Sequence, residues 1–114
     1  MTAVQTRPNG RIVSVVPKDE AETMNEVHGE DIDDQPVTWH VESRERLRVQ
    51  RATYRDIQKV PTTKVRFDEA SGSYTVTIPA AIAHAMHIVG GELEWDVKAG
   101  KLYASIESRG GDNE

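Results

Sequence analysis

The chain has 114 residues, of which 37% are hydrophobic and 29% charged, with a formal net charge of −5 and no cysteine. Such a chain fits one small globular domain rather than a disordered tail, and the missing cysteines exclude disulfides, thiolate metal sites and cysteine nucleophiles. Because the apolar runs are too short to cross a bilayer and no leader-like segment opens the chain, we expect a cytoplasmic protein, and the acidic excess with nine arginines to five lysines favours a salt-loving host.

The first segments of the chain predict two strands and a helix. Thr2–Thr6 and Ile12–Val16 are rich in β-branched residues, and Arg7–Gly10 between them holds the proline, asparagine and glycine that reverse a chain. Pro17 ends the second strand and suits the first turn of a helix, because that turn needs no amide proton there. A helix is therefore expected over Lys18–Met24, with acidic residues favouring its start.

A hairpin follows this helix. The acidic segment Asp31–Pro36 is interpreted as a hydrated insert. After it, Val37–Val41 and Leu47–Arg51 alternate apolar and polar residues, as strands with one buried face do. A linker of uncertain form, residues 52–61, leads to the second half of the chain.

The second half predicts the same elements in the same order. The expected strands, helix and hairpin strands are Thr63–Phe67, Tyr74–Ile78, Ala80–His87, Leu93–Val97 and Leu102–Ile106. Their apolar residues recur with the period of a strand or of a helix, and a turn with glycine, Asp68–Gly72, separates the first two. Residues 109–114 are expected to form a frayed, disordered tail.

This common order points to an internal duplication. Residues 10–30 and 72–92 align without a gap at an offset of 62 and share seven identities in 21 positions, whereas chance gives roughly one in twenty per position. Skipping the acidic insert then aligns the only two tryptophans, Trp39 and Trp95. The identical pairs are Gly10/Gly72, Pro17/Pro79, Ala21/Ala83, Met24/Met86, Val27/Val89, Gly29/Gly91 and Glu30/Glu92.

Each half is too small to close a core by itself. Four short strands and one helix would leave the tryptophan of each half exposed. We therefore expect the halves to share one core about a pseudo-twofold axis. The expected core residues are Ile12, Val16, Val37, Trp39, Val41, Leu47, Tyr74, Val76, Ile78, Met86, Leu93, Trp95, Val97, Leu102 and Ile106.

A turn with glycine, a strand that ends in Val/Ile-Pro and one short helix resemble the AbrB/MazE/SpoVT swapped-hairpin family. Gly10–Pro17 and Gly72–Pro79 carry this resemblance, which covers nearly the whole chain. Members of that family are usually dimers that interleave hairpins into one barrel, and many bind DNA as regulators or antitoxins. The resemblance implies a mainly β fold, a swapped-hairpin barrel with two short helices, built by one chain from two tandem β-β-α-β-β repeats, residues 1–51 and 62–108.

The resemblance also implies a DNA-contacting surface made by the first strand, the loop before the second strand and the start of the helix. The cations at matching positions are Arg7, Arg11, Lys18, Lys64 and Arg66. The second copy departs from the pattern, because Ser73 stands where Arg11 would be repeated. The adjacent helix arginines common in the family fall at Ala21-Glu22 and Ala83-His84, which are uncharged or acidic.

Further arginines surround the hairpin of the first half. We expect DNA contacts from this region as well, because each phosphate neutralised by a cation strengthens binding. The arginines in question are Arg44, Arg46 and Arg48. The alternative is that they pair with Glu42, Glu45 and the acidic insert and form a solvated surface.

Other groups of residues give weaker evidence for a metal or catalytic site. His84 and His87 have a helical spacing that could hold zinc, but no third ligand is evident, so solvent-exposed histidines are expected. The acidic insert lacks the glycine and the distal glutamate of a calcium loop. With no nucleophile beside a base and no glycine-rich phosphate loop, we expect no enzyme, no cofactor and no metal.

The sequence thus predicts a DNA-binding transcriptional regulator whose partner is duplex DNA and not a membrane. One chain would be a self-contained pseudo-dimer, and a further homo-oligomer is left open. The alternative is a protein-interaction module, antitoxin-like or adaptor, without DNA binding. Antitoxins usually carry a long partner-binding tail after the barrel, and only a short segment follows Ile106, which counts against a toxin partner.

Overall fold

The computed structural model describes residues 2–52 and 60–109, which contain eight strands and two helices. In chain order these are β1 Thr2–Thr6, β2 Ile12–Val16, α1 Lys18–His28, β3 Pro36–Ser43, β4 Arg46–Arg51, β5 Thr62–Asp68, β6 Ser73–Thr77, α2 Ala80–Ala85, β7 Glu92–Lys98 and β8 Lys101–Ser108. The predicted linker, 52–61, lies mostly outside the described residues, and so does the predicted tail, 109–114, apart from Arg109.

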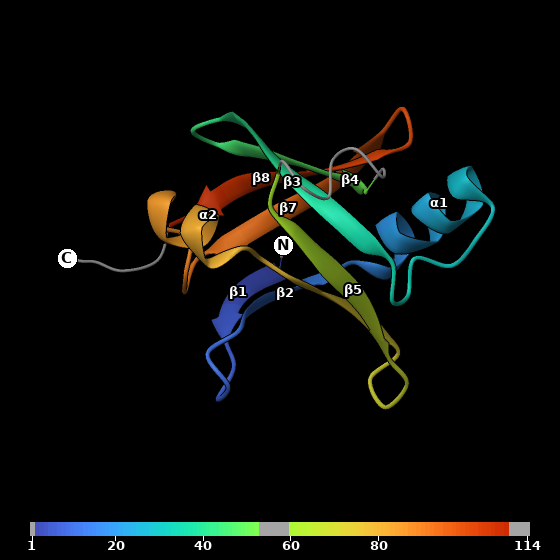
Figure 1. Ribbon diagram of the computed structural model, residues 1–114, viewed down its shortest axis with the longest axis horizontal. Helices are drawn as coiled ribbons and strands as arrows, with labels where there is room; N and C mark the ends of the chain where they lie inside the picture. The colour runs from blue at the N-terminus through green and yellow to red at the C-terminus, as the bar shows by residue number, and fades with distance from the viewer. Residues whose placement is uncertain (1, 53–59, 110–114) are drawn as a thin grey trace.

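The eight strands close into one antiparallel barrel. Neighbouring strands follow the order β1-β2-β6-β5-β3-β4-β8-β7, and β7 pairs back onto β1. The two helices lie at opposite sides of the barrel, and the four hairpin turns project from its corners (Figure 1). The predicted mainly β class with two short helices is confirmed. Within the described ranges, neither helix has the length and apolar content needed to cross a membrane.

The first helix is longer than predicted. It starts directly after Pro17, as expected, with acidic residues in its first turn. It continues past its predicted end at Met24 to His28 and stops where Gly29 takes a left-handed φ of 71°. Glycine adopts this conformation without steric penalty, so Gly29 ends the helix.

The second helix is shorter than predicted. It starts directly after Pro79 and ends at Ala85, not at His87. His87 lies beyond the helix with a φ of +56°, whereas His84 lies in its last turn. The two histidines are therefore not three positions apart on one continuous helix, and the spacing argument for a metal pair does not apply.

The first half is longer than the second between the start of the helix and the next strand, and the insert was predicted at Asp31–Pro36. The structure places the additional residues at the end of α1 instead. Asp34 has a left-handed φ of 62° and donates its N–H to the carbonyl of Val65 at 2.6 Å. Gly90 does the same in the second half, with a φ of 84° and a bond of 3.0 Å to the carbonyl of Val4. Asp34 therefore takes the place in the first half that Gly90 takes in the second.

The preceding turn supports this correspondence. Gln35 donates its N–H to the carbonyl of Ile32 at 3.1 Å, and Gly91 donates to Ile88 at 2.8 Å. The loop before β3 thus matches the loop before β7, with Ile32 and Ile88 both buried. The sequence alignment of Gly29 with Gly91 does not hold in the structure, because α1 is longer than α2 and the two glycines therefore lie at different points of the fold.

The two tryptophans lie in the core. Trp39 is 1% exposed and Trp95 4%, and their rings meet edge to face with centroids 6.5 Å apart. Each indole N–H donates to a threonine hydroxyl of the other half at 2.8 Å, Trp39 to Thr63 and Trp95 to Thr2. Because a buried N–H without an acceptor is unfavourable, these two bonds satisfy the donors that the shared core removes from water.

Most of the expected core is buried. Val97 and Ile106 are only partly buried against it. Val41 was predicted wrongly, because it is 56% exposed. The pairing of β3 with β5 ends at Thr38, so Val41 lies beyond the covered part of its strand. The confirmed core residues are Ile12, Val16, Val37, Trp39, Leu47, Tyr74, Val76, Ile78, Met86, Leu93, Trp95 and Leu102.

Candidate nucleic-acid interface

The turn between β1 and β2 holds two arginines in a fixed position. Arg7 donates its N–H to the carbonyl of Arg11 at 2.7 Å, and Gly10 donates to the carbonyl of Arg7 at 2.9 Å. Gly10 has a φ of +86°, which a residue with a side chain rarely adopts. The Asn9 carboxamide oxygen accepts the N–H of Arg11 at 3.0 Å. The backbone at both arginines is therefore anchored.

Strand β5 adds two cations to the same outer surface. Val65 is 1% exposed, and because side chains alternate along a strand, Lys64 and Arg66 face outward. Their side chains are 54% and 65% exposed. Strand β6, which pairs with both β5 and β2, carries Thr75 directly beside Arg66.

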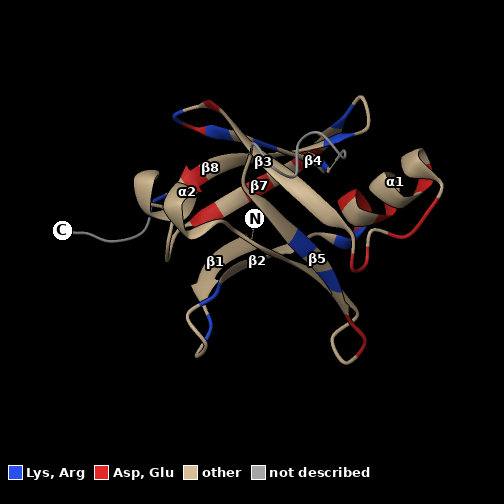
Figure 2. Ribbon diagram, viewed as in Figure 1, with Lys and Arg blue, Asp and Glu red and all other residues tan. Residues whose placement is uncertain are grey.

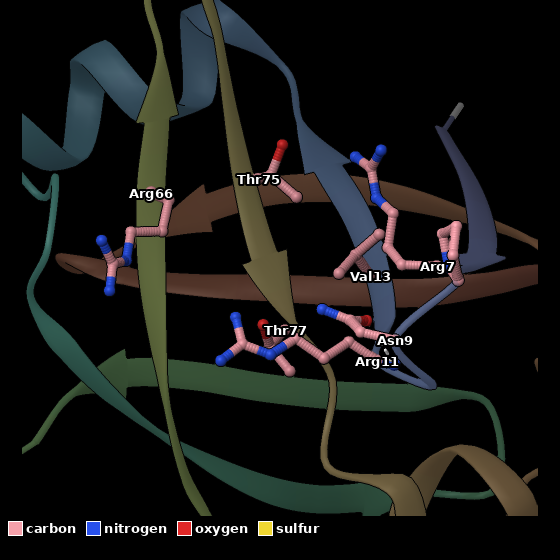
Figure 3. A pocket seen from close by; sticks show the side chains of 8 residues that line it. Arg7, Asn9, Arg11, Val13, Arg66, Thr75 and Thr77 are labelled. Carbon is pink, nitrogen blue, oxygen red and sulfur yellow. Dashed lines mark hydrogen bonds between the residues drawn. The ribbon is translucent and has the colours of Figure 1, made fainter.

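The turn and the strand meet at one corner of the barrel. A hollow of about 400 Å³ is lined by Arg7, Arg11 and Arg66 among others, and a second of about 190 Å³ is lined by Arg11, Lys64 and Arg66. Figure 3 shows Arg11 reaching from the turn across β6 toward β5. We call Arg7, Arg11, Lys64 and Arg66 the cationic corner. Its floor is formed by Val13, Thr75 and Thr77.

One carboxylate reaches the cationic corner in the described part of the chain. An oxygen of Asp34 lies 3.5 Å from the Lys64 ammonium and 3.6 Å from Nε of Arg66. Neither Arg7 nor Arg11 has a salt bridge within the described residues. Two of the four cations are thus paired, and two face solvent without an acidic partner among those residues.

The opposite end of the same outer surface has a different charge. The β5–β6 turn contributes Asp68 and Glu69, and β6 begins with Ser73. Strand β1 presents Ala3 and Gln5, on either side of a buried valine. Figure 2 shows the basic residues on β5 and the β1–β2 turn and the acidic residues on the β5–β6 turn. This surface is therefore cationic at one corner only.

No protein-family model, curated protein or solved structure matches this chain. The resemblance to the AbrB/MazE/SpoVT family accordingly stays a prediction.

Lys18 does not join the cationic corner as a lining residue. It is exposed at the start of α1, and acidic side chains surround the next turn. Burial raises the pKa of Glu20, and the neighbouring carboxylates Asp19, Asp96 and Glu94 raise it further. The environment of Lys18 is therefore acidic, which weakens it as a phosphate contact.

The hairpin arginines also lie apart from the cationic corner. Strand β4 pairs with β3 and β8 rather than with the strands of the corner. Arg48 forms a salt bridge of 2.6 Å with Glu42, and the Arg46 guanidinium lies 4.2 Å over the ring of Tyr103. Arg44 lies in the β3–β4 turn. The structure brings together four of the eight predicted cations, and the solvated-surface alternative fits Arg48.

The acids of the predicted insert have partners within the protein. The Tyr74 hydroxyl donates to Asp31 at 3.1 Å, and the N–H of Phe67 donates to the Asp33 carboxylate at 2.7 Å. Burial raises the pKa of Tyr74; the hydrogen bond from Asn25 opposes the rise, and Asp31 adds to it. Within residues 2–52 and 60–109, no three His, Asp or Glu side chains gather as a metal site would require.

Sequence reasoning missed three residues of this surface. Thr75 and Thr77 alternate with buried Tyr74 and Val76, so the alternation already indicated their outward direction. Asp34 had no comparable signal, because it lies in a loop and its contacts depend on the pairing of β3 with β5.

Proposed function

We propose that this protein is an AbrB-like, DNA-binding transcriptional regulator. In this proposal one chain forms a pseudo-dimeric swapped-hairpin barrel from two tandem repeats and contacts duplex DNA through the cationic corner. The observation that carries the proposal is the convergence of Arg7, Arg11, Lys64 and Arg66 from separate elements on one outer surface.

The strand order supports the tandem architecture. When β1 to β4 are exchanged with β5 to β8, the order around the ring is unchanged. The pairing of β2 with β6 includes Ser14 opposite Val76, its counterpart at an offset of 62. On the opposite side of the barrel, β4 and β8 pair with Arg48 opposite Tyr103, and the residues on either side of this pair face each other in the same symmetric way. Two like halves related by a twofold axis would produce this pattern.

The chemistry of the corner suits a phosphate backbone. Arginine guanidinium groups bind phosphate oxygens through several N–H donors, and lysine adds a point charge. The threonine hydroxyls of the floor supply neutral hydrogen-bonding groups of the kind that contact phosphates and sugars. Because the whole chain carries a net charge of −5, duplex DNA is repelled by the acidic surfaces and is oriented toward this corner.

The uneven charge implies one DNA contact surface per chain. A symmetric dimer would repeat its cations at both ends of this surface, but here the second end carries Asp68, Glu69 and Ser73. We therefore expect an asymmetric binding site on DNA, read mainly through backbone position and groove shape rather than through base edges.

Binding of a fluorescent duplex across a salt series tests the proposal. Arg11→Ala and Arg66→Ala should weaken binding and reduce the log–log salt slope by about 0.9 for each lost phosphate contact. Lys101→Ala is the matched control, because it removes an exposed cation from the start of β8, outside the corner. No binding by the wild type near 50 mM salt, or equal isotherms for all three variants, contradicts the proposal.

The second candidate is a protein-interaction module without DNA binding. A hollow of about 410 Å³ between the end of α1 and the β7–β8 turn favours it, since Val27 at its rim is 55% exposed. Under this candidate the corner substitutions leave function unchanged, whereas Val27→Asp abolishes partner binding. The salt series above separates the two candidates.

A further inference from the structure

Asp34 is held against the cationic corner by its backbone. Its N–H donates to the carbonyl of Val65 at 2.6 Å, and Val65 donates back to Gln35 at 3.2 Å. These bonds fix the loop to β5 between Lys64 and Arg66, the two cations that the Asp34 carboxylate contacts. The backbone of Asp34 is therefore held beside Lys64 and Arg66, and its short side chain reaches both cations.

The matching position in the second half carries no acid. Gly90 has the same left-handed conformation and the same backbone bond, to Val4, and the adjacent strand there presents Ala3 and Gln5. Glycine is the residue that this backbone conformation favours. The backbone alone therefore does not explain an aspartate at position 34. The acid occurs in the half whose neighbouring strand carries the cations.

We propose that Asp34 is an internal competitor for DNA phosphate at the cationic corner. One carboxylate oxygen lies 3.5 Å from the Lys64 ammonium and 3.6 Å from Nε of Arg66, so its negative charge partly offsets both cations and opposes an approaching phosphate. Carboxylate and phosphate are both oxygen anions attracted to the same two cations, so the carboxylate must turn away before a phosphate gains their full charge. Arg7 and Arg11 remain available for a first contact. This inference rests on the proposed function and adds a regulatory contact to the same surface.

The exposure of the pair sets the size of the effect. Asp34 is 60% exposed and its two partners are 54% and 65% exposed, so each ion pair is weak and exchanges readily. Removing both pairs should raise DNA affinity by about twofold to thirtyfold, the range that two exposed pairs supply. The salt slope should steepen by about 0.9 if one more phosphate is neutralised.

Two substitutions remove the carboxylate and keep the backbone. Asp34→Asn preserves shape and tolerates a left-handed φ, and Asp34→Gly copies the residue at position 90. Glu69→Gln is the matched control, because it makes the same change in net charge at a β5–β6 turn carboxylate that has no salt bridge within the described residues. A second control repeats Asp34→Asn in a Lys64→Gln/Arg66→Gln background, where the effect should vanish.

The duplex-binding titration then has distinct outcomes. Detectable binding by the wild type and tighter binding by Asp34→Asn and Asp34→Gly, but not by Glu69→Gln, support the inference. If the wild type binds and the Asp34 variants bind no more tightly than Glu69→Gln, the inference is overturned and the proposed function stands. If neither wild type nor variants bind, both are overturned. Circular dichroism of each variant verifies that it is folded.

Discussion

Thr63 accepts the hydrogen bond that joins the Trp39 indole to the second half of the chain, at 2.8 Å. Thr63→Val removes this acceptor and keeps the side-chain shape. Because Trp39 is 1% exposed, water cannot readily replace the lost hydroxyl, and an unsatisfied buried donor costs about 1–3 kcal/mol. For a domain of this size about 1 kcal/mol corresponds to about 4–8 °C, so the melting temperature should fall by about 4–24 °C.

Thermal unfolding followed by far-UV circular dichroism and by tryptophan fluorescence measures this change. Thr63→Ser is the control, because it keeps the hydroxyl and removes one methyl group. The two signals should change together, since both tryptophans lie in one core. The reasoning is refuted if Thr63→Val melts no lower than Thr63→Ser, and a shared core is refuted if the two signals give separate transitions.

Three further predictions concern packing, exposure and pH. Gly100 has a φ of +75°, and a Cβ there would lie 2.9 Å from Val27, so Gly100→Ala should lower the free energy of unfolding by about 1–3 kcal/mol. In thermal melts the added substitution Val27→Ala should restore part of this stability, and no restoration would argue against the clash. Leu47 is 0% exposed and Val41 is 56% exposed. In urea titrations Leu47→Ala should therefore lower the free energy of unfolding by about 2–5 kcal/mol, and Val41→Ala by under about 0.5 kcal/mol. Equal losses would contradict the exposure of Val41. The pKa of Tyr74 is raised above its ordinary 10.0, so its contribution to stability is complete below that value and is lost as the pH rises through the folded-state pKa. In urea titrations at alkaline pH, the free energy of unfolding should therefore fall less steeply with pH for Tyr74→Phe than for the wild type. An equally steep fall would exclude this cause.

The strands could be predicted closely because their signal is local. Ile12–Val16 and Thr2–Thr6 were predicted with the bounds that the structure gives, since β-branched residues between a turn and a proline leave few alternatives. The burial of Val41 could not be predicted in this way. Its alternation is correct for a strand, but its exposure depends on where the neighbouring strand stops pairing.

The position of the extra residues could not be found by matching identities. Both positions are glycine, but Gly29 ends α1 and Gly91 lies in the turn directly before β7. Ile32 and Ile88, which are both buried before the next strand, give the structural match. An ungapped alignment cannot detect that one helix is longer, because its extra turn consists of ordinary helix-forming residues.

The candidate site was predictable in part. Alternation around Val65 placed Lys64 and Arg66 on the outer face of their strand. Their proximity to Arg7 and Arg11 depends on which strands are neighbours in the barrel, and strand order is not encoded in any local pattern. For the same reason the sequence did not separate these cations from the arginines of β4.

Closure of the ring also governs how the protein meets other chains. A sheet that ends in an unpaired strand offers a row of free N–H and C=O groups, which can template strand addition and aggregation. In the described barrel β7, which closes the ring, pairs with β1 through Thr2 opposite Leu93 and Ala3 opposite Glu92, so the backbone groups of β7 are engaged at this seam. Strand addition at this seam would therefore first require the barrel to open, whereas side chains, helices and turns can take part in self-association without that step.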